Sequence, residues 1–155
     1  MRTFYEPTLE HLAALDSPSW CCSYSGGKDS SSLVTWIEWL RRAGWITVES
    51  PKLVRSDTGV EEQHLTVLAH EMTSLLEECG WECSLVTPEV NERLYAQILG
   101  RGLPPIHPGV RRMRWCTRAT KLDPMERWKD QAGVRLSITG LRLGESAMRD
   151  IVHVR

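Results

Sequence analysis

One hexapeptide, Ser25-Gly26-Gly27-Lys28-Asp29-Ser30, separates a segment with β-strand character from a segment with helical periodicity. Residues 20–24 before it are mostly apolar and β-prone, and Gly44 ends the helical pattern after it. The apolar side chains of that pattern recur on one helical face: Leu33, Val34, Trp36, Ile37 and Leu40. The first N–H groups of a helix lack partners within it and carry a partial positive charge. A strand, a glycine turn and a helix N-terminus in this order therefore predict a phosphate-binding loop.

The residue types of the hexapeptide suit this chemistry. Its two glycines let the backbone turn sharply and approach a ligand, its lysine supplies a positive charge, and its two serines supply hydroxyl donors. Asp29 suits a site that holds Mg²⁺, or it caps its own helix. The spacing is not that of a Walker A loop, which has four residues between its first glycine and the Gly-Lys-Ser/Thr. The structural alternative is an ordinary glycine turn with an Asp/Ser cap.

The composition is typical of one globular domain. The chain has 155 residues, of which 41% are hydrophobic and 25% are charged. Its five cysteines are an odd number without disulfide-like spacing, and no apolar run approaches the length of a membrane span. Glu6 and Glu10 stand where a signal peptide would be basic and then apolar. We expect a reducing, cytoplasmic setting and no membrane association.

The charge is unevenly distributed along the chain. Residues 1–100 carry 7 Lys+Arg against 15 Asp+Glu, whereas residues 101–155 carry 12 against 5. Net charges of −8 and +7 follow, although the whole chain is close to neutral. A basic C-terminal third favours an anionic partner, a nucleotide first and nucleic acid second.

Strands and helices are expected to alternate. The expected strands are residues 20–24, 52–56, 82–86 and 134–139, the last of them buried, while residues 45–48 form either an edge strand or a simple approach to 52–56. Four further helices are expected, over residues 1–18, 60–78, 91–99 and 116–129, and the first of them is expected to serve packing. Gly80 stops the helix over 60–78, whose apolar stripe is Leu65, Leu68, Ala69, Met72, Leu75 and Leu76. Asn91 caps the third helix, which is broken from Gly100, and Pro124 fits the first turn of a helix that starts at Asp123. Residues 100–113, rich in Gly, Pro and Arg, are expected to form a loop.

This alternation predicts an α/β fold with a doubly wound, mainly parallel sheet and helices on both faces. Ligands of such sheets bind at the carboxyl ends of the strands. Four strand ends are expected to meet on one rim, at residues 25–27, 57–59, 87–88 and 140–142.

Asp57-Thr58-Gly59 is the second candidate motif. A carboxylate and a hydroxyl at a strand end, beside a glycine, suit a ribose or a metal ion. The alternative is a helix N-cap followed by acidic residues in the first turn.

An arginine-rich stretch is the third candidate. Four arginines and one thiol fall within eight residues, with Lys121 one turn later: Arg111, Arg112, Arg114, Arg118 and Cys116. Guanidinium groups bind phosphate and sulfate bidentately, so the stretch predicts anion binding. Cys116 is either a reactive thiol with a lowered pKa or a small buried residue beside Trp115.

The last candidate follows the fourth expected strand. Gly140 turns the chain into a segment in which Arg142, Glu145 and Arg149 are three and four residues apart. In a helix these three share one face, where they form either an ion-pair ladder or a set of arginines directed at phosphates.

In this order, the motifs resemble the phosphoadenosine phosphosulfate (PAPS) reductase superfamily of pyrophosphate-loop (PP-loop, SGGxDS) ATP pyrophosphatases. The resemblance covers about residues 20–150, and its motifs are the hexapeptide, Asp57-Thr58-Gly59, Arg114-Trp115-Cys116-Thr117 with Lys121 and Pro124, and Gly140-x-Arg142-x-x-Glu145-Ser146-x-x-Arg149. The chain looks most like the DndC-type DNA-phosphorothioation branch, which has a similar Gly-Arg-Gly loop with two prolines before an Arg-Trp-Cys-Thr box.

The resemblance implies a single PP-loop domain over 1–155, with 19–150 as the nucleotide-binding core. It implies that ATP is cleaved at the α–β bond, giving AMP or an adenylyl group plus pyrophosphate, in sulfur transfer or nucleic-acid modification. Residues 25–30 would hold the β and γ phosphates, Asp29 would help bind Mg²⁺, and Arg142 and Arg149 would steady phosphate charge or the second substrate. The other implied nucleotide-binding residues are Asp57, Thr58, Gly59, Arg114, Lys121, Gly140 and Glu145.

The chain also departs from its presumed relatives. Reductases acting on PAPS have a degenerate loop and a cysteine in a C-terminal tail, whereas here the loop is intact and no cysteine follows Cys116. The cysteines that hold an iron–sulfur cluster in DndC-type enzymes are missing, so no cluster is expected. The chain looks like a minimal core, either compact or a fragment. Two alternatives to ATP chemistry stay open: a sulfonucleotide reductase that uses Cys116, and a non-catalytic nucleotide-binding module of a larger complex.

Overall fold

The computed structural model describes residues 19–102 and 115–140. Within them, four strands form one sheet in the order β3-β2-β1-β4, and every pair is parallel. The strands are β1 (Trp20–Tyr24), β2 (Lys52–Ser56), β3 (Glu82–Val86) and β4 (Leu136–Thr139). The expected bounds of the first three are confirmed. The expected helix over 1–18, nearly all of the Gly/Pro/Arg loop, and the chain after Gly140 lie outside the described residues.

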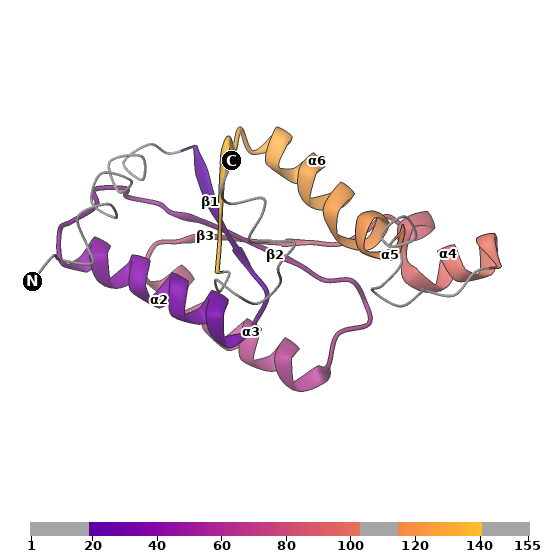
Figure 1. The fold of residues 1–155 in the computed structure, drawn as a ribbon. Helices are drawn as coiled ribbons and strands as arrows, with labels where there is room; N and C mark the ends of the chain where they lie inside the picture. Colours follow the sequence, from indigo (N-terminus) through magenta and orange to yellow (C-terminus); the bar gives the residue numbers. More distant parts are fainter. Residues whose placement is uncertain (1–18, 103–114, 141–155) are drawn as a thin grey trace, which may run out of the picture.

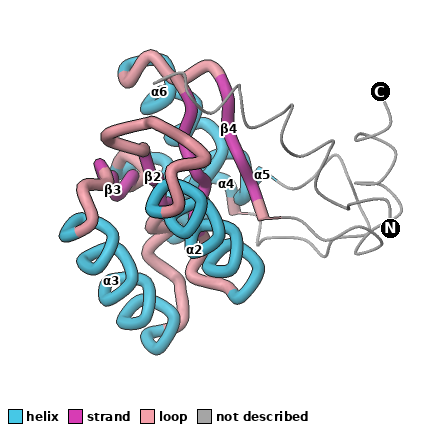
Figure 2. Tube along the Cα trace, turned by 90° about the vertical axis from the view of Figure 1, so that its left-hand side faces the viewer, coloured by secondary structure: helices cyan, strands magenta, loops and turns pink. Residues whose placement is uncertain are grey.

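Helices cover both faces of the sheet. In Figure 1, α2 (Lys28–Arg42) and α3 (Gln63–Glu78) lie on one side of the strands and α6 (Asp123–Gln131) lies on the other. Figure 2 shows the same separation from the side. The expected α/β class with a parallel sheet is confirmed, and the layering is compatible with a doubly wound fold.

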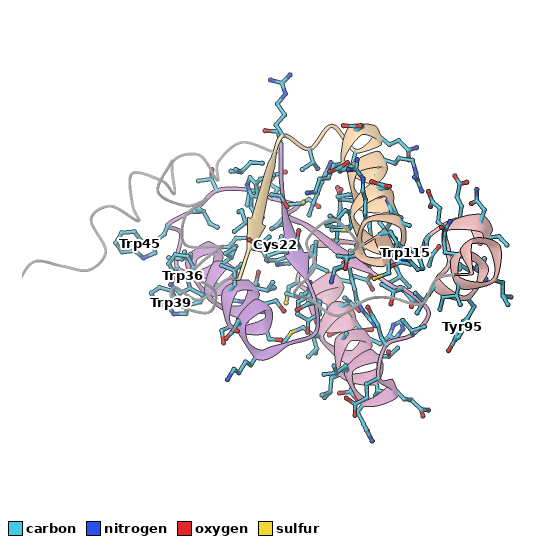
Figure 3. The ribbon with its side chains drawn as sticks, turned by 45° about the vertical axis from the view of Figure 1, so that its right-hand side comes forward. Cys22, Trp36, Trp39, Trp45, Tyr95 and Trp115 are labelled. Carbon is cyan, nitrogen blue, oxygen red and sulfur yellow. The ribbon has the colours of Figure 1, made fainter. Side chains whose placement is uncertain are left out.

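The core has one cluster on each face because neighbouring strand residues point in opposite directions. Cys22 and Leu53 pack with α2 and α3, whereas Cys21 and Val54 pack with Met125 of α6. Figure 3 shows Cys22 in the middle of the sheet. Because of the same alternation, the side chains of the last residues of β1 and β2 point alternately to the two faces of the sheet. The face to which each of them points decides whether it can line the candidate functional site described below.

Helix α2 matches its expected extent, and Gly44 follows it with a positive φ of 75°. Helix α3 begins at Gln63, three residues later than expected, because the preceding residues make other contacts. There, the Asp57 carboxylate accepts the Gly59 N–H at 2.9 Å, and Glu61 accepts a hydrogen bond from Arg55 at 3.4 Å. Gly80 ends this region with a φ of 87°, as expected.

The helical register of α3 was predicted correctly, but its buried face was not. Ala69 and Leu76 are buried, while Leu65, Leu68 and Leu75 are exposed. The structure therefore leaves part of the expected apolar stripe in contact with solvent.

The expected helix over 91–99 is wrong in its details. A capping box between Glu89 and Glu92 surrounds a short 3₁₀ turn, Val90–Glu92, so Asn91 lies within a turn and does not cap a helix. Helix α4 runs from Leu94–Arg101, through Gly100. It ends at Gly102, which adopts a left-handed φ of 65°.

The helical segment before β4 is confirmed. It comprises α5 (Trp115–Thr117), a π-helical turn (Arg118–Leu122) and α6, with Pro124 in the first turn of α6. Strand β4 was expected to be buried from residue 134, and this is wrong. The Val134 N–H donates to Lys129 O and the Arg135 N–H to Ser19 O, so the strand starts later. It lies at an edge of the described sheet, with Leu136 and Thr139 exposed. Residues 45–48 form no strand and are an approach to β2.

Some large apolar side chains are exposed near the C-terminal end of α2. Figure 3 shows Trp36, Trp39 and Trp45 grouped there, and Trp39 and Trp45 are 57% and 56% exposed. By contrast, Trp20 and Trp81 are buried, in an edge-to-face contact with ring centroids 6.3 Å apart. Across residues 19–102 and 115–140, none of the helices combines the length and apolar character that crossing a membrane requires.

Candidate functional site

The turn between β1 and α2 uses its two glycines differently. Gly26 has a φ of +78°, and an added Cβ would lie 3.4 Å from both Ala69 Cβ and Leu65 O of α3. Gly27 is the N-cap of α2 with φ −81°, a conformation open to any residue. Its added Cβ would meet only Ser25 Oγ, at 3.4 Å. Gly26 is therefore needed for the turn itself, whereas Gly27 keeps the approach to the helix N-terminus clear.

The serines of the hexapeptide hold the turn together. Ser30 Oγ donates to Gly27 O at 2.9 Å and lies 3.1 Å from Ser25 Oγ. Tyr24 Oη and Ser31 Oγ are 3.2 Å apart, which ties the end of β1 to the first turn of α2. Because Gly27 has no side chain, α2 has no side-chain cap. The turn thus leaves the N-terminus of a 15-residue helix open to an anion.

A pocket of 380 Å³, here called the α2 pocket, opens beside this turn. Its lining comes from the ends of β1, β2 and β4 and from α2, α6 and the π-helical turn: Ser23, Tyr24, Ser25, Gly27, Asp29, Ser30, Ser56, Lys121, Met125, Thr139 and Gly140. Among the described residues, the lining is rich in hydroxyl groups and contains one lysine and one carboxylate. Six of these residues were predicted from the sequence: Ser25, Gly27, Asp29, Ser30, Lys121 and Gly140.

Gly140 seals one wall of the α2 pocket. An added Cβ would lie 2.6 Å from Asp29 O and 2.8 Å from Asp29 C, closer than a Cβ approaches other heavy atoms in proteins. The end of β4 therefore packs directly on the backbone of the first turn of α2, and only glycine fits there.

The second motif lies in a neighbouring pocket. Asp57, Thr58 and Gly59 line a 330 Å³ cavity, the Asp57 pocket, together with Val60, Thr87, Pro88, Arg93, Leu94 and Tyr95. The expected rim of strand ends is therefore split between two pockets, with Ser56 in the lining of the α2 pocket and Asp57 in the lining of the Asp57 pocket. The alternative in which this motif caps a helix is wrong, because the N-cap of α3 is Glu62.

Several predicted residues do not line the α2 pocket. Lys28 is exposed as the first residue of α2, and Gly26 supports the turn from behind. Cys116 is half-buried in α5, where its carbonyl oxygen accepts a 2.8 Å hydrogen bond from Thr120. Neither pocket includes Cys116 in its lining. Arg111, Arg112, Arg114, Arg142, Glu145 and Arg149 lie outside the described residues.

The cysteines are all free thiols. Burial raises the pKa of Cys22 to about 12 and that of Cys83 to about 11, so both stay protonated at neutral pH. In the part of the chain that the structure describes, no three His, Cys, Asp or Glu side chains gather at a common metal position.

The sequence analysis missed two serines that line the α2 pocket. Ser23 and Ser56 are on the α6 face of neighbouring parallel strands, near the carboxyl ends. Ser23 Oγ is 2.9 Å from Ser137 Oγ of β4. Ser56 is 5% exposed, and its hydroxyl has no hydrogen-bond partner among the described residues. Strand alternation counted from Cys21 and Val54 would have identified both positions.

The α2 pocket can bind an anion, because a helix N-terminus, an ammonium group and several hydroxyls border it. Among the described residues, Asp29 is the carboxylate that lines the pocket, so it is the residue there that could offer an oxygen ligand to Mg²⁺. In comparisons with known proteins, the sequence matches no family model, and no curated protein matches it significantly.

Proposed function

We propose that the protein binds an adenine nucleotide in the α2 pocket and cleaves or transfers at its α–β phosphate bond. The observation that carries the proposal is the uncapped N-terminus of α2, which borders the same 380 Å³ pocket as Lys121. The resemblance to the PAPS reductase superfamily, and to its DndC-type branch, supports ATP as the substrate. A PP-loop fold agrees with the parallel sheet and the placement of helices on both of its faces.

The pocket residues would act mainly by positioning and by neutralising charge. The backbone at Gly27 and the first turn of α2 would hold the pyrophosphate group that leaves. Lys121, across the pocket, would balance phosphate charge. Asp29 would contribute one oxygen ligand to Mg²⁺, which neutralises phosphate charge when bound.

In the reaction, an oxygen of the acceptor attacks the α-phosphorus and the α–β bond breaks. The bonding electrons leave with pyrophosphate, and the acceptor's proton passes to solvent. With water as acceptor, the other product is AMP. With another acceptor, an adenylyl group is transferred. That acceptor is a nucleic acid or a sulfur-carrying partner in this proposal.

Cys116 distinguishes this proposal from the reductase alternative. A sulfonucleotide reductase would need its thiol at the anion, and Cys116 is not among the residues that line the α2 pocket. The non-catalytic binding module shares the site with our proposal and differs only in turnover.

The proposal can be tested by thermal stabilisation with a panel of ligands: ATP with Mg²⁺, its α,β-methylene analogue, GTP and PAPS. A ligand at about 100 times its Kd stabilises the folded state by roughly 2.7 kcal/mol. We expect stabilisation by ATP and the analogue but not by PAPS. Pyrophosphate release from ATP, measured with candidate acceptors, separates an enzyme from a binding module. No stabilisation by any nucleotide would refute the proposal.

Gly27→Ala should weaken ATP binding without harming the fold. The added methyl group occupies space beside the N-terminus of α2, yet the backbone at Gly27 already has a conformation that alanine adopts. We expect a Kd for ATP at least about 10-fold higher, or roughly 1.4 kcal/mol, and a nearly unchanged Tm without ligand. Gly100→Ala is the matched control, since a Cβ there contacts nothing within 4 Å among the described residues and ATP binding should be unaffected. Equal affinity of Gly27→Ala and wild type would remove the α2 N-terminus from the site.

A further inference from the structure

Ser56 is the one residue lining the α2 pocket whose side chain leaves a buried hydrogen-bonding group unused among the described residues. It ends β2, is 5% exposed, and its Oγ has no partner in residues 19–102 and 115–140. A buried hydroxyl without a partner destabilises the folded state. Such a group in a pocket wall is accounted for if a ligand supplies the missing partner.

The neighbouring hydroxyls differ from Ser56 in this respect. Ser23 is 2.9 Å from Ser137 Oγ, on the adjacent strand. Ser25 and Ser30 are 3.1 Å apart, and Ser30 also donates to Gly27 O. These three serines already have partners within the protein, so their hydroxyls shape the pocket in the absence of a ligand.

The position of Ser56 indicates which part of a nucleotide it meets. Ser56 lines the α2 pocket together with the first turn of α2, and the next residue, Asp57, lines the Asp57 pocket. The Asp57 pocket has apolar and aromatic walls from Val60, Leu94 and Tyr95, which suit a nucleoside, and Arg93 also lines it. A nucleotide with its pyrophosphate at α2 and its nucleoside in the Asp57 pocket would span both linings, which adjoin in the sequence at Ser56 and Asp57, and its α-phosphate would then be the part nearest Ser56.

We propose that Ser56 Oγ donates a hydrogen bond to a non-bridging oxygen of the α-phosphate, with Lys121 as the nearby cation. This inference rests on the proposed function, and it assigns the reacting phosphate to a subsite distinct from that of the leaving pyrophosphate. Ser56 Oγ is covered in the absence of ligand, so the proposed contact requires its hydroxyl to turn toward the pocket, which a change of the single χ1 angle of serine would allow.

The test compares three probes on purified wild type, Ser56→Ala and Ser50→Ala by calorimetry and thermal unfolding. The probes are inorganic pyrophosphate, AMP, and ATP with Mg²⁺. For Ser56→Ala we expect AMP and ATP to bind about 10- to 100-fold more weakly, because a hydrogen bond to a charged group is lost. Pyrophosphate should bind as it does to wild type, within about two-fold. The Tm without ligand should be no lower than that of wild type, because the hydroxyl that is removed was unsatisfied.

Ser50→Ala is the matched control. Ser50 lines neither the α2 pocket nor the Asp57 pocket, and its hydroxyl is already paired, since it donates to Gly80 O at 3.2 Å. Ser50→Ala should leave the affinities for all three probes close to those of wild type, and its Tm without ligand should be no higher than that of wild type. A loss of AMP and ATP affinity is thus expected in Ser56→Ala and not in Ser50→Ala.

Each other outcome overturns the inference in a recognisable way. If Ser56→Ala binds AMP and ATP as wild type does, Ser56 is not a ligand contact, and the proposed function stands. If it loses pyrophosphate as well, Ser56 belongs to the pyrophosphate subsite. A lower Tm without ligand would give Ser56 a structural role. If wild type binds none of the probes, the proposed function fails and the inference fails with it.

Discussion

Gly140→Ala is expected to destabilise the protein and to abolish ATP binding at once. The new methyl carbon would lie 2.6 Å from Asp29 O and 2.8 Å from Asp29 C, both atoms of a helix backbone. A backbone cannot turn aside as a long side chain can, so β4 or the first turn of α2 must shift. Overpacking of this kind costs about 2–3 kcal/mol, which lowers the Tm by roughly 4–12 °C in a chain of this size.

Gly27→Ala provides the comparison for this effect. Both variants add one methyl group to the lining of the α2 pocket, but only the methyl group at residue 140 collides with backbone atoms. We therefore expect Gly27→Ala to lose affinity alone, and Gly140→Ala to lose both affinity and Tm. Differential scanning calorimetry and ATP titration of the two variants measure this difference. A Gly140→Ala protein with the Tm and ATP affinity of wild type would show that β4 does not pack on α2 as described.

Local patterns in the sequence were sufficient for most individual elements. Alternation and glycine punctuation predicted β1, β2 and β3 to the residue, and Pro124 correctly indicated a helix start at Asp123. These features depend on neighbours within a few positions. The short apolar runs of the central strands also predicted correctly that these strands are buried inside the fold.

Contacts between segments far apart in the sequence determine the features that local patterns did not predict. Residues 57–59 line a different pocket from the hexapeptide, although Ser56, the residue just before them, lines the same pocket as the hexapeptide. The exposed stripe on α3 and the edge position of β4 depend on which elements lie beside them. Ser56 is a small polar residue at a strand end, and only its burial and missing partner distinguish it.

Glu38 is another residue whose role only the structure reveals. It lies in α2 with 8% of its surface exposed, and its carboxylate accepts four hydrogen bonds from three residues, one of them from Arg41 Nη2 at 3.1 Å. Arg41 Nε donates to it at 2.9 Å, Arg42 Nε at 2.7 Å and the buried Trp81 Nε1 at 2.8 Å. Arg41 also donates to Cys79 O, at the end of α3. The carboxylate thus joins α2 to the segment between α3 and β3.

The ionisation of Glu38 should therefore contribute to stability. Burial acts to raise the pKa of Glu38, but the hydrogen bonds from Arg41, Trp81 and Arg42 outweigh it and lower the pKa from 4.5 to about 2. A folded-state pKa below the unfolded one stabilises the protein fully above pH 4.5. That stabilisation is lost as the pH falls toward 2. Solvent around the exposed Arg42 weakens one of the three contacts.

Glu38→Gln is expected to lower the free energy of unfolding by about 2 kcal/mol at pH 7, after allowance for that screening. The difference from wild type should shrink as the pH falls from 4.5 to about 2, because wild type then loses the charge that the variant never had. Urea unfolding of both proteins between pH 7 and pH 2.5 measures this difference. Glu71→Gln, an exposed carboxylate of α3, is the control and should differ little from wild type at any pH. If the difference in the free energy of unfolding between wild type and Glu38→Gln stays constant down to pH 2.5, the effect comes from packing and not from charge. If that difference is near zero at pH 7, the neutral amide binds Trp81 and Arg41 as well as the carboxylate does.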